Sequence, residues 1–187
     1  MIRGEHMTLR VVQEHDLETL FRYSSDLDNR GEFFPLRLPS EAVFKQDFHR
    51  HGFWREHRGR LVVVDQANVI LGSIWFYQPL RYFDALEIGY LMFDWGSRNK
   101  GYMTEALALL ARYLFQTRTM RRLQLTVVVG NLASKRVAEK CGFTSEGVAR
   151  KAVFLRVHHM DLEWFSLLRE EAGQQPWWQG HRGEGVP

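Results

Sequence analysis

Residues 60–129 of this 187-residue chain restrict the architecture that it can adopt. Four stretches have the alternating or continuously apolar character of β-strands: 60–65, 69–77, 85–93 and 123–129. The first two are separated only by Gln66-Ala67-Asn68, which predicts an antiparallel hairpin. The last two are separated by a helix-spaced apolar pattern from Met103 to Gln116. Hairpins pair strands antiparallel and helical crossovers join parallel strands, so the order predicts a mixed sheet.

The rest of the chain supplies more elements of both kinds. They are a strand at 8–12, a helix capped by Asp16, a helix capped by Ser40 that extends to about Trp54, a short helix capped by Asn131, and a closing hairpin of 144–154 and 158–168. We therefore expect an α/β fold with a mixed central sheet of about seven strands and helices on both faces. Residues 1–170 are predicted to form one domain. The Gly-, Gln- and Pro-rich segment 171–187 is predicted to be a poorly ordered tail.

Composition narrows the functional classes. The net charge of +3 is compatible with a phosphorylated ligand and too small to argue for nucleic acid. The single Cys141 excludes an internal disulfide and a cysteine-based zinc site. His158 and His159 are adjacent on a predicted strand and face opposite ways, so no metal site is predicted. The sequence shows no signal-peptide core and no run of about 20 apolar residues, so we expect a cytoplasmic protein without a membrane segment.

The loop before the helix at 103–116 is the most informative segment. It contains Arg98, Lys100 and Gly101. A loop that leads into a helix N-terminus presents unpaired backbone N–H groups and the positive end of the helix dipole, and the two cations add charge beside them. This combination favours a phosphate site. The alternative interpretation is an ordinary strand–helix connection whose basic side chains are solvated, because such a loop can contain the same residues.

The loop resembles the coenzyme-A pyrophosphate loop of GNAT acetyltransferases, Arg/Gln-x-x-Gly-x-Gly/Ala. Arg98, Gly101 and Met103 occupy its three defined positions, and Met103 stands where a small residue is usual. A second resemblance is to the superfamily's Asn-x-x-Ser…Gly-Phe-x-x-Glu-Gly segment, which appears here as Asn131, Ser134, Gly142, Phe143, Glu146 and Gly147. The resemblance covers about residues 7–170. It is closest to the branch that includes RimJ/RimL-type ribosomal-protein N-terminal acetyltransferases.

The resemblance implies that acetyl-CoA is the co-substrate and that an acetyl group passes to a primary amine in a ternary complex. It also implies that the strand before the loop diverges from the strand after the helix, with pantetheine in the gap between them. The implied coenzyme-binding residues are Leu91, Met92, Phe93, Arg98, Asn99, Lys100, Gly101, Tyr102, Met103, Thr104, Asn131 and Ser134. The family habit of forming dimers adds a homodimer to these expectations.

Two side chains are predicted to take part in catalysis. An amine of pKa about 10.4 is neutral in only about one molecule in a thousand at pH 7, so the reaction needs a base. Glu87, on the strand beside the expected thioester, is the first candidate for that base or for a water relay; an exposed strand carboxylate is the alternative.

Many family members protonate the leaving thiolate with a tyrosine where this chain has Ala138. The Rim-type branch uses the serine that matches Ser134, which would otherwise be only a residue of the first helical turn. That branch also has a carboxylate base where this chain has Val153, so this role does not carry over.

The acceptor side is expected near the first two helices and the last hairpin. Acidic residues precede two phenylalanines there, an arrangement that suits a cationic amine, although an ordinary polar loop has the same composition. The predicted acceptor-binding residues are Glu32, Phe33, Phe34 and His158. A protein N-terminus, an aminoglycoside, a polyamine and a small amine all stay open as acceptors.

Two other functional classes stay open. Segment 49–60 interleaves basic residues with Phe53 and Trp54, as nucleic-acid-binding surfaces do, although a solvated helix end has the same pattern. The second class is a coenzyme-A-binding protein without catalysis, because Ala138 and Val153 replace two expected catalytic groups.

Overall fold

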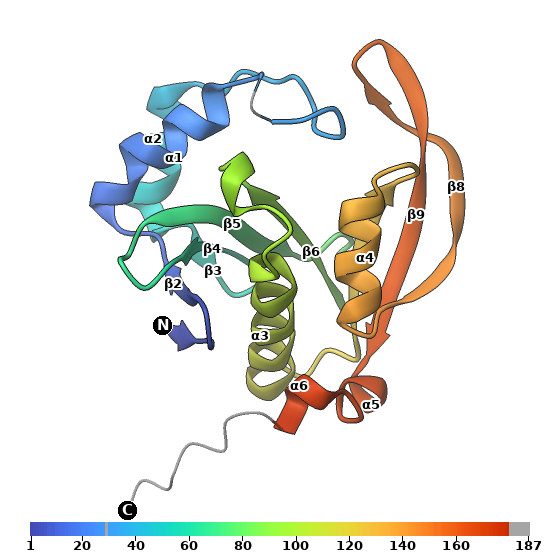
Figure 1. Cartoon of the computed structure of the whole chain (residues 1–187). Coiled ribbons are helices and arrows are strands. Elements are labelled where there is room, and N and C mark those ends of the chain that lie inside the picture. Colours follow the sequence, from blue (N-terminus) through green and yellow to red (C-terminus); the bar gives the residue numbers. More distant parts are fainter. Residues whose placement is uncertain (29, 180–187) are drawn as a thin grey trace, which may run out of the picture.

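A single nine-stranded sheet runs through the computed structural model, which describes residues 1–28 and 30–179 (Figure 1). The strands are β1 (Ile2–Arg3), β2 (Thr8–Val11), β3 (Trp54–Arg55), β4 (Arg58–Val64), β5 (Ile70–Tyr77), β6 (Ala85–Met92), β7 (Arg122–Val128), β8 (Thr144–Leu155) and β9 (His158–Leu168). Their order is β1-β2-β4-β5-β6-β7-β9-β8, with β3 paired to β4. The predicted mixed sheet is confirmed. The two strands missed, β1 and β3, are each two residues long and too short to show a periodic pattern.

Helices cover both faces of the sheet, as predicted (Figure 1). They are α1 (Leu17–Ser25), α2 (Glu41–His51), α3 (Tyr102–Thr117), α4 (Leu132–Lys140), α5 (Arg169–Ala172) and α6 (Pro176–Gln179), with short 3-10 turns η1 (Glu14–Asp16) and η2 (Trp95–Ser97). Among the described helices, none has the length and apolar character needed to cross a bilayer.

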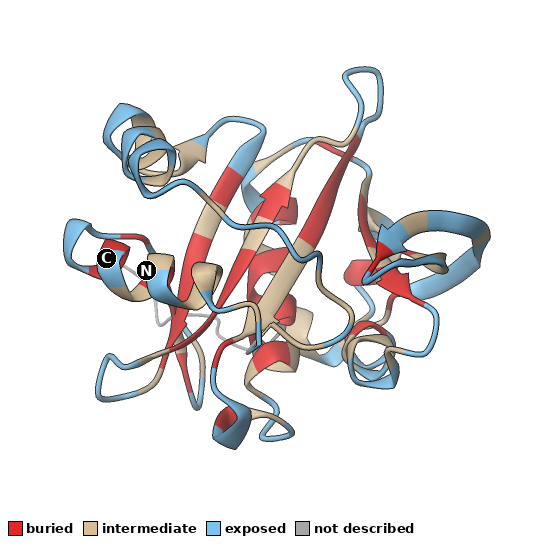
Figure 2. Cartoon of the chain, turned by 90° about the horizontal axis from the view of Figure 1, so that it is seen from above, coloured by how far each residue is buried: buried red, intermediate tan, exposed pale blue. Residues whose placement is uncertain are grey.

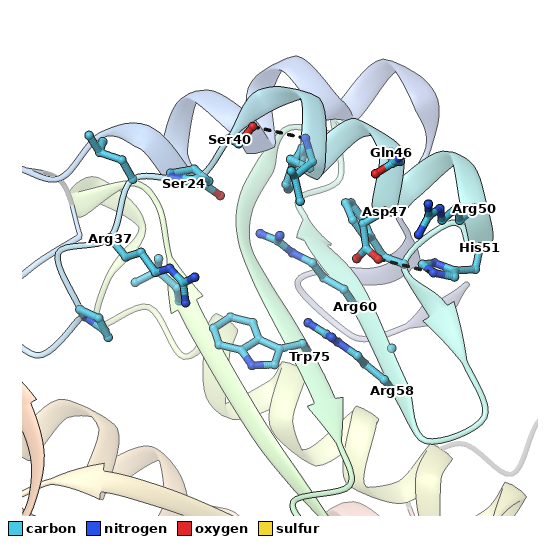
Figure 3. Close-up of a pocket in the computed structure, with 18 of the residues that line it drawn as sticks. Ser24, Arg37, Ser40, Gln46, Asp47, Arg50, His51, Arg58, Arg60 and Trp75 are labelled. Atoms are coloured by element: carbon cyan, nitrogen blue, oxygen red, sulfur yellow. Dashed lines mark hydrogen bonds and ion pairs between the residues drawn. The ribbon is translucent and has the colours of Figure 1, made fainter.

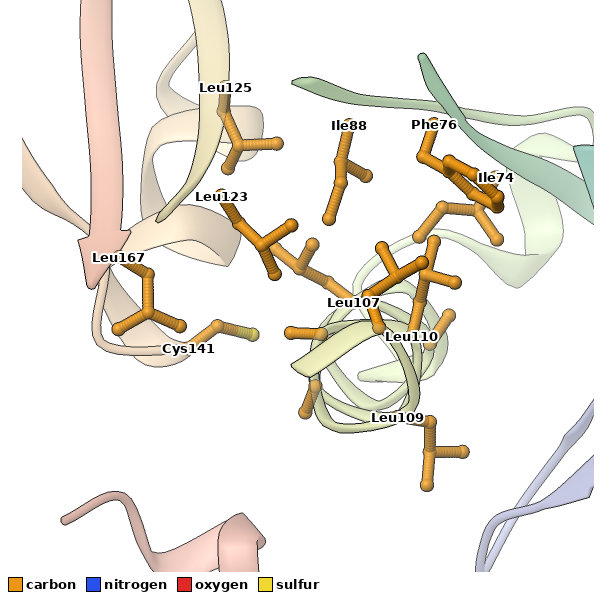
Figure 4. Close-up of a cluster of buried hydrophobic side chains, with 14 of the residues drawn as sticks. Ile74, Phe76, Ile88, Leu107, Leu109, Leu110, Leu123, Leu125, Cys141 and Leu167 are labelled. Atoms are coloured by element: carbon orange, nitrogen blue, oxygen red, sulfur yellow. The ribbon is translucent and has the colours of Figure 1, made fainter. Parts of the chain in front are cut away.

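The larger core lies on the α3 face. Leu107 and Leu110 of α3 are fully buried among leucine, isoleucine and phenylalanine side chains of the central strands (Figure 4). A smaller core on the opposite face joins Leu17 and Leu20 of α1 to Val62 and Phe93 of the sheet. The buried residues concentrate on the middle strands (Figure 2), whereas α2 has no buried residue. The sheet therefore lies between a large hydrophobic core on its α3 face and a small one on its α1 face.

The sheet is split in its middle. β6 and β7 form its parallel pair, and their pairing covers only Ala85–Arg122, Leu86–Leu123 and Glu87–Gln124. Both strands continue for several residues beyond the last pair, β6 to Met92 and β7 to Val128. The two strands thus diverge after Glu87 and leave a gap in the sheet.

Local signals place most helix ends. The side chains of Ser40 and Asn131 cap α2 and α4, as predicted. Asp16 does not cap α1 with its side chain: the carboxylate is buried and accepts hydrogen bonds from the Arg10 guanidinium at 2.6 and 2.9 Å. Helix α2 stops at Gly52, whose φ of 59° is left-handed, so Trp54 lies in β3 and not in the helix.

The C-terminal segment differs from its prediction. Residues 171–179 include the end of α5 and all of α6, where Trp177 and Trp178 pack against the larger core. The Trp177 indole N–H donates to the Cys141 carbonyl at 3.2 Å. Burial of two large rings outweighs the polar composition of the segment. The remaining part of the predicted tail, 180–187, lies outside the described residues.

Candidate active site

The loop between β6 and α3 presents a row of free backbone donors. Among the described residues, no acceptor binds the amides of Asn99 through Thr104, whereas the next amide, Glu105, donates to the Gly101 carbonyl at 3.0 Å. The Arg98 amide is already used, because it donates to the Trp95 carbonyl at 3.2 Å. Gly101 has a φ of 85°, and a Cβ placed on it would meet no protein atom within 4 Å. The loop and the first turn of α3 therefore form an open anion-binding concavity.

Cations stand beside this concavity. The Arg98 guanidinium lies 3.5 Å from the centroid of the exposed Trp95 ring, which holds it at the loop. Lys100 is exposed. These residues are in place to attract a diphosphate.

The gap between β6 and β7 exposes strand backbone. The Phe93 amide donates to the Leu71 carbonyl of the neighbouring chain segment at 2.9 Å. Backbone groups alternate in direction along a strand, so Leu91 and Phe93 direct theirs toward β5, and Tyr90 and Met92 direct theirs into the gap. The resemblance implies that Leu91, Met92 and Phe93 bind the coenzyme, and of these three Met92 alone has backbone groups that point into the gap. The Phe93 side chain is also unavailable, since it stacks on Tyr23 in the smaller core.

Glu87 stands where the gap begins. The residue is 8% exposed, and its carboxylate accepts hydrogen bonds from Tyr77 Oη at 2.8 Å, Gln124 Nε2 at 3.0 Å and Thr126 Oγ1 at 2.9 Å. Burial and the bond to Glu87 raise the pKa of Tyr77, so this phenol stays protonated and donates. The environment differs from an exposed strand carboxylate, which was the alternative interpretation of Glu87.

Ser134 lies on the α4 side of the same gap. Asn131 caps the helix by accepting from the Ser134 amide at 3.2 Å. The Ser134 hydroxyl is 2.9 Å from the hydroxyl of Tyr90, which reaches across from β6. Burial raises the pKa of Tyr90, and the phenol therefore stays protonated at neutral pH. Tyr90 is a site residue that the sequence prediction missed.

The predicted acceptor residues are only partly brought together. Phe34 packs edge-on against Trp75, with ring centroids 6.2 Å apart, and lines a cavity beside α2. Glu32, Phe33 and His158 do not line that cavity. Phe33 instead lies close to Gly130, and Glu32 and His158 are exposed. The turn before His158 is tied to the acceptor-side loop, because Arg156 donates to the Gly31 carbonyl at 3.2 Å.

Other predicted features have structural roles. Phe53 packs against Phe44 and Phe48, and Trp54 packs against Phe76, so the rings of segment 49–60 are used inside the protein. Both rings thus pack against other aromatic side chains, which argues against a row of free rings for stacking nucleic-acid bases. Burial raises the pKa of the Cys141 thiol to about 12, which makes it a poor nucleophile. No group of three metal-ligating side chains occurs in the part of the chain that the structure describes.

Comparison with known proteins agrees with this geometry. Residues 6–144 match the family described as the acetyltransferase (GNAT) domain. The chain is 30% identical to the "Putative ribosomal N-acetyltransferase YdaF" of Bacillus subtilis over 96% of its own length and 97% of that protein. It is 40% identical to the "Probable N-acetyltransferase YjcK" of the same organism, with coverage of 82% and 88%.

Solved structures share the fold. A GNAT-family acetyltransferase from Bacillus anthracis superposes with a TM-score of 0.76 at 25% identity, covering 91% of this chain and 99% of the other. Spermidine N-acetyltransferase from Vibrio cholerae, solved with CoA and spermine, superposes with a TM-score of 0.80 at 18% identity, covering 90% and 99%. The matched domain and the curated relatives together show that the chain belongs to the GNAT family and is an N-acetyltransferase that uses acetyl-CoA.

Proposed function

We propose that the chain binds acetyl-CoA across the gap between β6 and β7 and that the acceptor amine attacks the thioester directly. The observation that carries this proposal is the position of the free amides of residues 99–104 next to that gap. The diphosphate would accept from these amides, with Arg98 and Lys100 beside it. The backbone of Met92 would pair with pantetheine. Asn131 caps α4 by accepting from the Ser134 amide, and Ser134 would lie at the thioester end.

Glu87 is proposed to receive the proton of the incoming ammonium, directly or through a water molecule. Its three donors hold the carboxylate in one orientation at the apex of the gap. The neutral amine nitrogen then attacks the carbonyl carbon to form a tetrahedral intermediate and gives its second proton to water. The carbon–sulfur bond breaks, the thiolate leaves, and the proton released to water restores the one that the thiolate takes from the protein. Backbone N–H groups along the open edge of β6 can stabilise the oxyanion of the intermediate.

The proton for the departing thiolate is proposed to come from Ser134, with Tyr90 behind it. The two hydroxyls are 2.9 Å apart, and the buried phenol is protonated at neutral pH. A proton given by Ser134 to sulfur can be replaced from Tyr90 along this hydrogen bond. The pair thus compensates for Ala138, which occupies the usual tyrosine position.

The acceptor is proposed to be a primary amine of a protein N-terminus or of a small molecule. YdaF is named a putative ribosomal N-acetyltransferase, which favours a protein acceptor, and the Vibrio cholerae structure with spermine shows that this fold also accommodates polyamines. A cytoplasmic location and a homodimer are further proposals from the family resemblance. Titration with acetyl-CoA, followed by detection of thiol release with a panel of amines, tests the function. A rise in melting temperature without thiol release from any amine would favour the alternative of a coenzyme-A-binding protein without catalysis.

Substitution Glu87→Gln tests the proposed base. It should lower kcat by about 100-fold or more, the typical contribution of a general base, and leave the dissociation constant of acetyl-CoA unchanged. Asp84→Asn is the matched control, because Asp84 is an exposed carboxylate just before β6. Unchanged turnover of the Glu87→Gln protein would remove Glu87 from the mechanism.

A further inference from the structure

A cavity of about 870 Å³ lies beside α2, between the loop at residues 30–40 and strands β4 to β6 (Figure 3). Its lining is strongly basic. Six arginines contribute to it: Arg30, Arg37, Arg50, Arg55, Arg58 and Arg60. Among the described lining residues, Asp47 is the only carboxylate. The cavity therefore carries a large excess of positive charge.

Arg60 is the central cation of this cavity. Its Nε donates to Ser73 Oγ at 2.9 Å, and its guanidinium lies over Phe44 and Phe53 at 5.8 and 5.9 Å from their centroids. No described carboxylate pairs with it. Burial, followed by the charges of Arg30 and Arg58, lowers its pKa to about 10. Arg60 is half-buried, and a cation that is partly withdrawn from water without a counter-ion from its own chain is costly unless a ligand provides one.

The acid in the lining does not supply that counter-ion. Asp47 lies 3.4 Å from His51 Nε2 and 3.6 Å from Arg55, at the far side of the cavity from Trp75 (Figure 3). Arg30 donates to the backbone carbonyls of Ser24, Pro35 and Arg37, which carry no net charge. Arg37 and Arg58 extend toward Trp75 (Figure 3), and no described carboxylate is within ion-pair distance of either.

The cavity opens on the face of the sheet that carries Glu87. Leu91 and Phe93 of the β6 segment line it, and side chains two residues apart on a strand share a face, so Glu87 belongs to that face too. The register places Arg60 opposite Trp75, and Trp75 opposite Gly89. Neighbouring strands are about 4.8 Å apart, so Arg60 lies roughly 10 Å across the sheet from the start of the gap. One molecule can span that distance.

We propose that the acceptor is an amine that also carries an anionic group, a carboxylate or a phosphate, which Arg58 and Arg60 bind while the amine lies beside Glu87. This inference rests on the proposed acetyl transfer and specifies its substrate class. It replaces the cationic amine that the acidic residues of the acceptor loop suggested. Phe34 and Trp75 supply apolar surface between the two charged ends of the substrate.

Matched acceptors test the proposal. The first series is three short peptide amides that differ only at the second residue, which is glutamate, glutamine or lysine. The second pair is phosphoethanolamine and ethanolamine, and spermidine is the cationic comparison. We expect kcat/KM to be about 10- to 100-fold higher for the anionic member of at least one series, the range of one hydrogen-bonded charge pair. Which series shows the preference distinguishes a peptide from a small phosphorylated amine.

Variants assign the preference to the cavity. Arg58→Met should reduce the preference about tenfold or more, and Arg58 is exposed on β4, so the fold should tolerate the change. Arg60→Lys keeps the charge but loses the planar pair of donors, and should weaken the preference less. Arg81→Met removes the same charge from an exposed loop outside the cavity and is the control.

Three results would overturn the inference. The first is equal or better turnover of the neutral and cationic acceptors, and the second is an anionic preference that survives in the Arg58→Met protein. The third is a loss of acetyl-CoA affinity in that variant, which would assign the arginines to the coenzyme. By contrast, coenzyme binding without thiol release from any amine would count against the proposed transfer itself.

Discussion

Substitution Gly101→Ala separates the backbone conformation of the loop between β6 and α3 from the diphosphate binding that we propose for it. The residue has a left-handed φ of 85°, so any Cβ costs about 1–2 kcal/mol of stability. The added methyl group meets no protein atom within 4 Å and projects into open space beside the free amides. A diphosphate held away from these amides would lose at least one charge-assisted hydrogen bond, worth about 1.5–3 kcal/mol. Affinity for acetyl-CoA should therefore fall at least about tenfold.

The expected size of the effect can be worked out for a thermal-shift assay. A ligand at 100 times its dissociation constant stabilises the native state by about 2.7 kcal/mol. One kcal/mol moves the melting temperature of a domain of this size by about 2–4 °C, so acetyl-CoA should raise that of the unsubstituted protein by roughly 5–11 °C. At the same acetyl-CoA concentration, tenfold weaker binding stabilises the Gly101→Ala protein by only about 1.4 kcal/mol. Its melting temperature should therefore rise by about half as much.

Gly52→Ala is the matched control. Gly52 also has a left-handed φ, 59°, and a methyl group added to it would meet no protein atom within 4 Å, but it ends α2 on the other face of the sheet. Both variants should melt at lower temperature than the unsubstituted protein without ligand, for the same backbone reason. The Gly52→Ala protein alone should keep the full rise with acetyl-CoA. A full rise in the Gly101→Ala protein would show that residues 99–104 do not hold the diphosphate.

Two further predictions concern buried polar groups. Tyr90→Phe should lower kcat about tenfold or more without changing acetyl-CoA affinity, because it removes the hydroxyl that resupplies the Ser134 proton in the proposed relay. Equal kcat in a steady-state assay would contradict the relay. Asp16→Asn should reduce the free energy of unfolding at pH 7 by about 3–5 kcal/mol, since it leaves the buried Arg10 unpaired. Burial raises the pKa of Asp16, but the bonds from Arg10 and the Gln13 amide outweigh it, and the net shift is downward. A carboxylate with a lowered folded-state pKa stabilises the protein above its unfolded pKa and loses that contribution as the pH falls through the folded value. Urea unfolding of the unsubstituted and Asp16→Asn proteins should therefore show a difference in unfolding free energy that shrinks below about pH 4. A difference that is constant with pH would contradict this account.

The elements and the free backbone amides of the loop between β6 and α3 could be predicted because their signals are local. Ser40 and Asn131 precede their helices as caps, and the free amides of the loop follow from a glycine-containing connection into α3. The resemblance to GNAT proteins also anticipated the split between β6 and β7, which no periodic pattern contains.

The rest of the site depends on register between distant strands. The three donors to Glu87 come from β5 and β7, and the sequence does not say which residues of those strands stand opposite it. The arginine cavity was missed for a similar reason. Arg58 and Arg60 have the pattern of a solvated basic segment, and only the pairing of β4 with β5 brings them beside Trp75. Tyr90 lies on a strand that the sequence predicts, but its contact with Ser134 spans 44 residues of chain.

The short junction between β6 and β7 also has a mechanical consequence. The sheet consists of two antiparallel halves, or panels: strands β1–β6 form one, and strands β7, β8 and β9 form the other. Three residue pairs between β6 and β7 connect the panels, whereas seven pairs connect β7 with β9 inside the second panel. A small rotation between the panels would concentrate at this junction, as hinge motions concentrate at the weakest connection. Such a rotation widens or narrows the opening without disturbing the ladders inside either panel. A wider opening would admit a long, flexible ligand without breaking strand pairs on either side of the junction.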